Sequence, residues 1–205
     1  MVVEEVDIKA GREGVPGVYA FFARYLLMPW QSCLDVGGGL GRGKAILLRR
    51  SKYIRSIDIE PALEKYGVVY SRVEDENTAG FDWCIAVDVI EHVKDDEHFL
   101  SELLRVARRG VFVSTPNRLH HPEHRWSYHV REYSPEELRK LFQKVAPDYA
   151  IIHFSCEIYG GNMRMRLPAN EDEHQAILCF KEGGKLYKSL LRLRELILNL
   201  CRSKY

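Results

Sequence analysis

The chain lacks a charge excess, a cysteine pair and a long apolar run. Its 205 residues carry 30 Lys and Arg against 29 Asp and Glu, so the overall charge does not argue for a nucleic-acid ligand. The five cysteines are scattered, without a C-x-x-C pair, which favours a reduced intracellular protein over a disulfide scaffold. No apolar stretch approaches the roughly 18 residues of a membrane span. The acidic start of the chain differs from a signal peptide, and we expect a cytoplasmic protein.

Glycine, by contrast, is concentrated in one short segment. The apolar strand expected at 32–36 contains Asp35 and is followed by five glycines within positions 37–43. Glycine tolerates positive φ and has no Cβ to hold a ligand away, so this segment suits a tight turn against a bound group. The apolar period that follows predicts a helix up to about residue 50, whose first N–H groups would face that group. The nicotinamide spacing G-x-G-x-x-G fits in no register, because the third glycine is always missing.

Strands and helices alternate along the rest of the chain. Periodicity predicts strands at 53–59, 68–73, 81–87, 111–115, 149–158 and 174–180 and helices at 15–28, 91–107 and 135–145. Strands separated by helical crossovers imply a parallel sheet that is covered on both faces. A chain of this length suits a single domain over 1–205. We expect it to consist of a helical cap over 1–30, a core over 31–181 and a basic amphipathic helix over 185–205.

Three segments of this pattern resemble one known family. Asp35, Gly37, Gly39 and Gly41 form an Asp-x-Gly-x-Gly-x-Gly sequence that resembles the first motif of class I S-adenosylmethionine (SAM)-dependent methyltransferases. The sequence FDWCIAVDVIEHV at 81–93 resembles the fourth strand and following turn of small-molecule and RNA methyltransferases of this class. The sequence GVFVSTPN at 110–117 resembles their fifth strand. The resemblance implies a Rossmann-like α/β fold with a mostly parallel seven-stranded sheet, an antiparallel last strand and helices on both faces.

The resemblance also assigns SAM as the cofactor and places its contacts. The residues expected around its methionine part are Asp35, Gly37, Gly39 and Gly41, and Asp88 is a further expected cofactor contact. Asp58 ends the second expected strand, where an acidic side chain can accept both ribose hydroxyls. Glu74 or Asp75 would contact the adenine amine, with a solvated turn as the alternative for both.

The segment after the fourth expected strand also suggests acid–base or metal chemistry. If a helix starts near Asp88, then Asp88, Glu91 and His92 project from one helical turn. His129 follows the Pro-Asn turn and can approach from the other side. Two carboxylates and two imidazoles suit a divalent metal that lowers the pKa of a substrate hydroxyl. His92 and His129 are therefore candidate catalytic residues, and all four residues are candidate metal ligands.

This set resembles two metal-assisted subfamilies of the same class. One comprises the small-RNA 3′-terminal 2′-O-methyltransferases, with Glu-x-x-Glu-His and a later His, and the other the ubiquinone-pathway O-methyltransferases. The chain departs from both because Asp88 stands where they have Glu. The alternative is structural: Asp88-x-x-Glu91 also matches a capping box. His92 would then only form part of the wall of the SAM pocket.

Two further segments are candidates for substrate and partner contacts. Residues 118–129 follow the fifth strand at the carboxyl edge of the sheet, where ligands bind in open α/β folds. They combine aromatics with Arg118 and Arg125, which suits a substrate lid that stacks on a ring and binds a phosphate or carboxylate. A solvated loop is the alternative. The basic helix expected at 185–205 can lie on an anionic membrane, dock a partner or pack on its own domain.

These observations predict a SAM-dependent methyltransferase that acts on an oxygen of a small molecule. The short cap elements and the neutral overall charge favour a small acceptor over RNA. A metal-assisted RNA 2′-O-methyltransferase is the first alternative. A SAM-binding interaction protein without catalytic activity, which would use its terminal helix, is the second.

Overall fold

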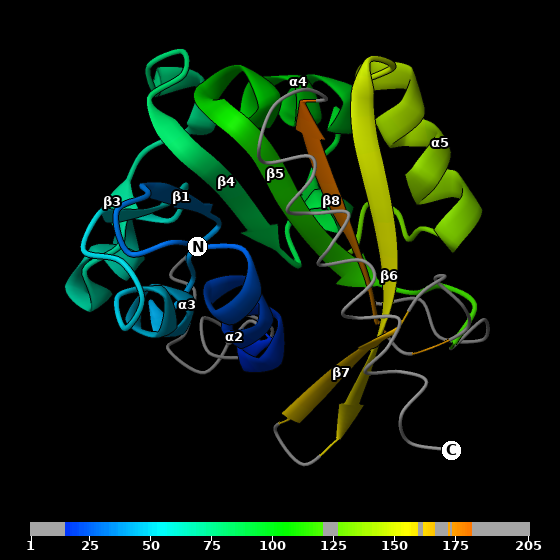
Figure 1. Ribbon diagram of the computed structural model, residues 1–205, viewed down its shortest axis with the longest axis horizontal. Helices are drawn as coiled ribbons and strands as arrows, with labels where there is room; N and C mark the ends of the chain where they lie inside the picture. The colour runs from blue at the N-terminus through cyan, green and yellow to red at the C-terminus, as the bar shows by residue number, and fades with distance from the viewer. Residues whose placement is uncertain (1–14, 121–126, 160–161, 167–171, 173, 182–205) are drawn as a thin grey trace.

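The computed structural model describes residues 15–120, 127–159, 162–166, 172 and 174–181. Its strands are β1 Cys33–Val36, β2 Ile54–Asp58, β3 Val69–Tyr70, β4 Phe81–Val87, β5 Ala107–Pro116, β6 Tyr149–Tyr159, β7 Asn162–Arg166 and β8 His174–Lys181. Its helices are α2 Pro16–Tyr25, α3 Arg42–Leu47, α4 Asp96–Val106 and α5 Pro135–Val145, with 3-10 turns η1 Pro61–Tyr66, η2 Val73–Asp75 and η3 Ile90–His92. The strands form one sheet in the order β3-β2-β1-β4-β5-β8-β6-β7 (Figure 1).

The sheet is mostly parallel, as predicted. Strands β3, β2, β1, β4 and β5 pair in parallel, whereas β8 is antiparallel to both of its neighbours, β5 and β6. One strand was not predicted: β7 forms a hairpin with β6 and extends the sheet to eight strands (Figure 1). Its sequence, NMRMR, contains no β-branched or aromatic residue, so local propensity does not mark it as a strand.

The two faces of the sheet bury separate apolar clusters. Along β4, Cys84 and Ala86 join the cluster formed with α4 and α5, while Trp83, Ile85 and Val87 join the cluster formed with α2. This alternation follows from the two-residue period of a strand. On the α2 face, the Phe22 ring packs 5.9 Å from Trp83, centroid to centroid. Helices therefore cover both faces, as expected for this fold class.

Local signals explain where α5 and α4 begin, and three elements differ from their predicted bounds. The Ser134 side chain accepts from the Glu137 N–H and Pro135 occupies the first turn, so α5 begins where the sequence predicts. The helix expected from Glu91 is wrong at its start: α4 begins at Asp96, because the Asp95 carboxylate caps it by accepting from the His98 N–H. α3 ends at Leu47, earlier than expected, and β3 has only two residues.

Parts of two predicted elements lie outside the described residues. The helical cap expected over 1–30 is represented by α2, and its first 14 residues are not described. The basic helix expected over 185–205 also lies outside the described range. Within the described part of the chain, no helix is both long enough and apolar enough to cross a membrane.

Candidate active site

The glycine turn after β1 requires glycine for two physical reasons. Gly37, Gly39 and Gly41 have φ of 73°, 51° and 73°, in the left-handed region that other residues rarely adopt. Gly38 is required by space, because a Cβ there would lie 1.8 Å from Ser56 Oγ. Likewise, a Cβ on Gly43 would lie 2.2 Å from the Tyr19 ring. The turn is thus packed closely against β2 on one side and α2 on the other.

Asp58 fastens this turn to the end of β2. Its Oδ2 accepts from the Gly39 N–H at 3.1 Å and its Oδ1 accepts from the Glu60 N–H at 3.1 Å. The side chain is buried, with 8 % of its surface exposed. Asp58 also lines the cavity described next, so its carboxylate both shapes the turn and reaches the space where a ligand would bind.

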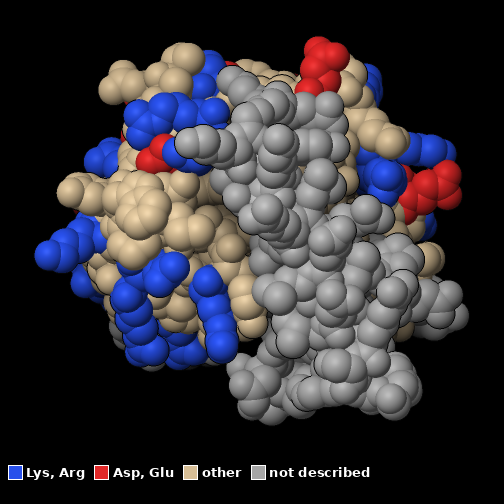
Figure 2. Space-filling view, in the orientation of Figure 1, with Lys and Arg blue, Asp and Glu red and all other residues tan. Residues whose placement is uncertain are grey.

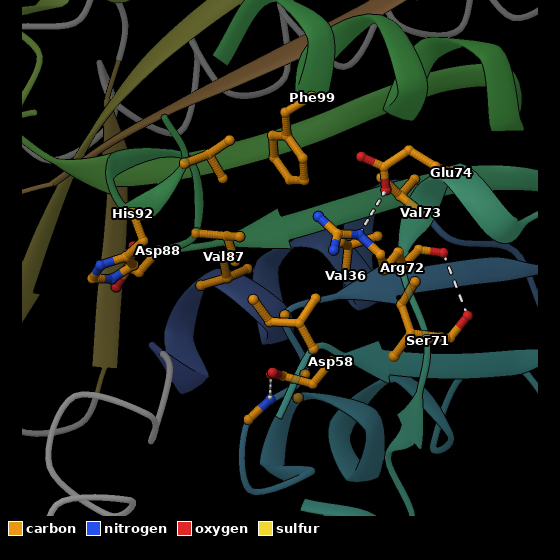
Figure 3. A pocket seen from close by; sticks show the side chains of 18 of the residues that line it. Val36, Asp58, Ser71, Arg72, Val73, Glu74, Val87, Asp88, His92 and Phe99 are labelled. Carbon is orange, nitrogen blue, oxygen red and sulfur yellow. Dashed lines mark hydrogen bonds and ion pairs between the residues drawn. The ribbon is translucent and has the colours of Figure 1, made fainter. Parts of the chain in front are cut away.

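A cavity of about 960 Å³ opens at the carboxyl edge of the parallel strands (Figure 3). That volume lies at the upper end of the ~300–1,000 Å³ of small-molecule sites. At one end the wall is formed by Gly37, Gly38 and Gly39 with Asp58. Further residues come from η2, from the segment after β4 and from α4; they are Ser71, Arg72, Val73, Glu74, Val89, His92, Val93, Lys94, Asp95, His98 and Phe99.

The structure separates the two candidates for the adenine contact. Glu74 lines the cavity, and its carboxylate lies 3.8 Å from the Arg72 guanidinium (Figure 3). Asp75 does not line the cavity; its carboxylate accepts from the Arg72 N–H and closes the η2 turn. Arg105 on α4, which sequence reasoning missed, holds η2 in place by donating to the carbonyl oxygens of Val73 and Glu74. No sequence signal links an arginine 31 residues away to this turn.

Asp35 lies behind the glycine turn and does not line the cavity. Its Oδ1 accepts from the Tyr19 hydroxyl at 2.9 Å and its Oδ2 accepts from the Ser56 hydroxyl at 2.8 Å. Burial raises the pKa of Asp35 to about 6, although both hydroxyl bonds act to lower it. Tyr19 itself lines the cavity. The carboxylate expected to contact SAM therefore joins α2 to β1 and β2, and Gly41, at the start of α3, also lies outside the cavity wall.

Asp88 does not start a helix, which corrects both the predicted helical turn and the capping box. Its φ is 54°, a left-handed conformation rare for a non-glycine residue. The side chain bonds within the sheet instead: Oδ1 accepts from Ser114 Oγ at 3.2 Å and Oδ2 lies 3.3 Å from His174 Nε2. Asp88 still lines the cavity. Strained backbone of this kind is concentrated at functional sites.

Three of the four candidate metal ligands come together. Each of Glu91, His92 and His129 offers one ligand atom, and these three atoms lie within 4.8 Å of one another. Asp88 is not part of this group. Glu91 is 1 % exposed; its Oε2 accepts from Thr115 Oγ1 at 3.0 Å, whereas its buried Oε1 has no hydrogen-bond partner among the described residues. Burial raises the pKa of Glu91 well above its ordinary value, and the Asp88 carboxylate raises it further.

The hydrogen bonds of the two imidazoles determine which nitrogen carries the proton. His92 Nδ1 lies 3.2 Å from the Tyr128 carbonyl oxygen, which can only accept, so Nδ1 is the donor and Nε2 keeps its lone pair. His129 Nδ1 lies 3.0 Å from Glu132 Oε1, with the same consequence. His92 lines the cavity beside Tyr128, whereas the His129 side chain is only 5 % exposed. Burial lowers the pKa of His129 and so favours the neutral ring.

The expected substrate segment is described in part. Tyr128 lines the cavity and packs its ring 5.7 Å from that of His92. Arg118 does not line the cavity; it forms an ion pair with Glu137 on α5 at 2.7 Å. Arg125 lies outside the described residues. Glu132 and Thr115, which orient His129 and Glu91, were not identified from the sequence. Thr115 lies 24 residues from Glu91, so only the tertiary fold brings them together, whereas Glu132 lies three residues from His129 and its spacing was a signal that sequence reasoning missed.

Comparison with known proteins agrees with this geometry. A family model for the methyltransferase domain matches residues 13–152. A probable SAM-dependent methyltransferase of Mycolicibacterium smegmatis is 31 % identical over an alignment of 126 residues that covers 54 % of this chain. The chain spans about half the length of that curated relative, 49 %.

Solved structures share the fold at low sequence identity. A Thermotoga maritima SAM-dependent methyltransferase, described as a possible histamine N-methyltransferase, superposes with a TM-score of 0.65 and 18 % identity, covering 83 % of this chain and 91 % of that one. The Burkholderia thailandensis 1,6-didemethyltoxoflavin N1-methyltransferase, with S-adenosylhomocysteine bound, gives 0.61 and 15 %, covering 87 % and 82 %. The chain therefore belongs to the methyltransferase domain family, with the class I fold and the SAM cofactor of the SAM-dependent methyltransferases.

Proposed function

We propose that this protein transfers the methyl group of SAM to an oxygen of a small-molecule acceptor. The observation that carries the proposal is the continuity of the cavity, which runs from the glycine turn and Asp58 to His92 and Tyr128. One end therefore offers the polar groups that a nucleoside needs. The other end offers a proton acceptor and an aromatic ring, so donor and acceptor can be held in one enclosed space.

The cofactor end would bind SAM through groups of known geometry. Gly37 and Gly39 let the backbone approach the methionine part closely. The Asp58 carboxylate would accept from the ribose hydroxyls, and the Glu74 carboxylate would accept from the adenine amine, since both residues line the cavity. Asp35 and Gly41 would act indirectly, by shaping the turn, because neither lines the cavity. Asp88 would bound the space around the sulfonium.

At the acceptor end, His92 would serve as the general base. Its Nδ1–H is bonded to the Tyr128 carbonyl, so Nε2 can take a proton from an acceptor hydroxyl. As the hydroxyl oxygen bonds to the methyl carbon, the carbon–sulfur bond breaks and the sulfur keeps the electron pair, which leaves neutral S-adenosylhomocysteine. Glu132 orients His129, and His129 would in turn help to position His92, because both imidazoles belong to one cluster with Glu91.

The test measures SAM binding and turnover separately. We expect SAM-dependent release of S-adenosylhomocysteine with a panel of phenols, alcohols and carboxylates. His92→Ala should lower kcat about 10²–10⁴-fold, the usual contribution of a general base, while the Kd for SAM changes little. His98→Ala is a matched control, since His98 also lines the cavity and lies beside Glu74. SAM binding without a methylated product from any acceptor would favour the alternative of a SAM-binding interaction protein.

A second candidate is metal-assisted transfer to a 2′-hydroxyl of RNA. The group of Glu91, His92 and His129 favours it. In the part of the chain that the structure describes, the buried Glu91 Oε1 lacks a hydrogen-bond partner, and both imidazoles keep an Nε2 lone pair. These three residues would hold a divalent ion, which would lower the pKa of the acceptor hydroxyl. Chelator sensitivity, restored by Mn²⁺ or Mg²⁺, together with activity on RNA 3′ ends, would support this candidate. Activity that is unchanged by chelator and by His129→Ala would exclude metal assistance.

A further inference from the structure

Two loops at the amino ends of β1 and β2 expose large apolar side chains. Met28 and Trp30 come from the loop that leads into β1, and Leu48 and Tyr53 from the loop that leads into β2. Their exposed fractions are 37 % and 72 % for the first pair and 45 % and 62 % for the second. We call these four residues, with the cations Arg49, Arg50 and Lys52 between them, the amino-end surface. Exposed apolar patches of proteins often mark surfaces that bind another molecule.

Hydrogen bonds hold the two loops together. The Arg50 guanidinium donates to the Leu27 carbonyl at 2.9 Å, and Ser51 Oγ donates to the Gln31 carbonyl at 2.6 Å. Gln31 Oε1 in turn accepts from the Met28 N–H at 2.8 Å and from the buried Trp83 indole at 3.1 Å. The exposed Trp30 therefore stands on a turn that is anchored in the core. Its ring is presented to solvent without a large ordering cost on binding.

The charge around these side chains is positive. The two loops, residues 26–32 and 48–53, contain three cations, Arg49, Arg50 and Lys52, and no acid. Asp82 on the neighbouring strand β4 is bonded to the Ser32 N–H and paired with Arg108 and Arg109. Figure 2 shows Lys and Arg side chains gathered over α2 and α3, the helices that lead into the two loops.

This combination of groups matches the chemistry of an anionic bilayer surface. Trp and Tyr favour the level of the lipid headgroups, Met and Leu gain by entering the acyl boundary, and Arg and Lys attract acidic phospholipids. Nucleic acid fits less well, because the exposed Met28 and Leu48 cannot stack on bases or bond to phosphates. We propose that the amino-end surface docks this domain on membranes that contain anionic phospholipid.

Docking there would leave the cavity open. The parallel strands run from the amino-end surface to the cavity edge, and the seven residues of β4 span about 20 Å at ~3.3 Å per residue. The two sites therefore lie at opposite edges of the sheet. Docking at this surface requires neither a particular acceptor nor the activity proposed above.

The experiment is cosedimentation of the full chain with vesicles. We expect binding to vesicles of phosphatidylcholine that contain about 30 % phosphatidylglycerol, enough anionic lipid to give a strong surface potential. We expect little binding to pure phosphatidylcholine, and release of the bound chain by high salt. Trp30→Ala should lower the partition coefficient about tenfold, since one interfacial aromatic is lost. The double variant Arg49→Glu with Lys52→Glu should lower it on the order of 30-fold or more.

The matched controls lie elsewhere on the surface. Tyr70→Ala removes an aromatic side chain that is 57 % exposed on β3, and Arg139→Glu with Lys140→Glu reverses two exposed charges on α5. Both should bind vesicles as the unmodified chain does. Absence of binding, equal binding to neutral vesicles, equal loss in the controls, or binding to RNA alone would each overturn the proposal. So would binding that persists in the Trp30 and charge-reversal variants, since the contact would then lie in another segment such as 185–205.

Discussion

Asp35 and Asp82 lie on the neighbouring strands β1 and β4, yet the pKa values of their carboxyl groups are shifted in opposite directions. Burial raises the pKa of Asp35 to about 6, behind the glycine turn. Asp82 lies at the amino edge; burial acts to raise its pKa too, but the Ser32 N–H and Arg109 outweigh it, and the pKa is lowered. One edge therefore buries acids beside a ligand cavity, whereas the other surrounds its acid with cations.

The contrast shows how one sheet can carry two kinds of site. At the carboxyl edge, loops are held close by buried polar bonds, such as those of Asp58 and Glu91, and they enclose a cavity. At the amino edge, the loops are equally well anchored, by Gln31 and Ser51, but they point apolar and basic side chains outward. Enclosed polar groups suit a small ligand, and an exposed apolar surface suits a large partner.

The largest effect should come from adding one methyl group to the glycine turn. Gly38→Ala places a Cβ 1.8 Å from Ser56 Oγ, so we expect a loss of about 3 kcal/mol in the free energy of unfolding, the upper range for overpacking. Urea denaturation measures it. Gly80→Ala, in the turn before β4 at the amino edge, meets its nearest atom at 3.0 Å and should cost about 1 kcal/mol. Equal losses of stability in the two variants would contradict the closer packing of the turn at the carboxyl edge.

Removal of the Asp58 carboxylate should weaken SAM binding without unfolding the domain. Asp58→Ala loses the bonds to the Gly39 and Glu60 N–H groups and the expected ribose contact. Hydrogen bonds to a charged group contribute about 1.5–3 kcal/mol, so the Kd for SAM, measured by calorimetry, should rise about 10- to 100-fold. Asp75→Ala is the control, because its carboxylate also bonds a backbone N–H in a turn but lies off the cavity. A Kd that rises equally in both variants would contradict the assignment.

The pH dependence of stability should differ between the two acids. The folded-state pKa of Asp35, about 6, lies above the value of about 3.9 in an unfolded chain. The folded state therefore binds the proton more tightly, and stability falls as the pH rises from about 4 to 6, by on the order of 2–3 kcal/mol. Asp35→Asn should remove this fall, as measured by denaturation at each pH.

Asp82 supplies the opposite sign in the same experiment. Because its folded-state pKa is lowered, the ionised carboxyl stabilises the fold above the unfolded pKa, and this stability is lost as the pH falls through the lowered pKa. Asp82→Asn should therefore reduce stability at neutral pH and leave it nearly unchanged in strong acid. Matching profiles of stability against pH for the two Asn variants would refute the opposite pKa shifts of the two carboxyl groups.

The smallest effect belongs to the amino-end surface. Tyr53→Ser and Leu48→Ser remove side chains that are 62 % and 45 % exposed, so each should change the free energy of unfolding by no more than about 0.5 kcal/mol. The Kd for SAM should stay the same, because the cavity lies at the other edge. A loss of SAM affinity in either variant would show that the two edges are coupled.

Residues that act locally were predicted well from the sequence. The start of α5 at Pro135 and the positive φ of Gly37, Gly39 and Gly41 depend on neighbours within a few positions. Asp88 was predicted wrongly because its conformation depends on distant contacts and only its local spacing could be read. Its spacing to Glu91 and His92 fits a helix, but its bonds to Ser114 and His174, 26 and 86 residues away, hold it in a left-handed conformation instead.

The sequence by itself determined the alternation of strands and helices, the position of the glycine turn and the resemblance that leads to SAM, because each depends on residue type and spacing along the chain. Only the tertiary structure decided which acids reach the cavity: Asp58 and Glu74 do, whereas Asp35 bonds to Tyr19 and Ser56. It also brought Glu91 and His92 to His129, and placed the apolar and basic loops of residues 28–31 and 48–53 side by side at the far edge. Burial and pairing are set by contacts between distant segments, and spacing along the chain does not specify them.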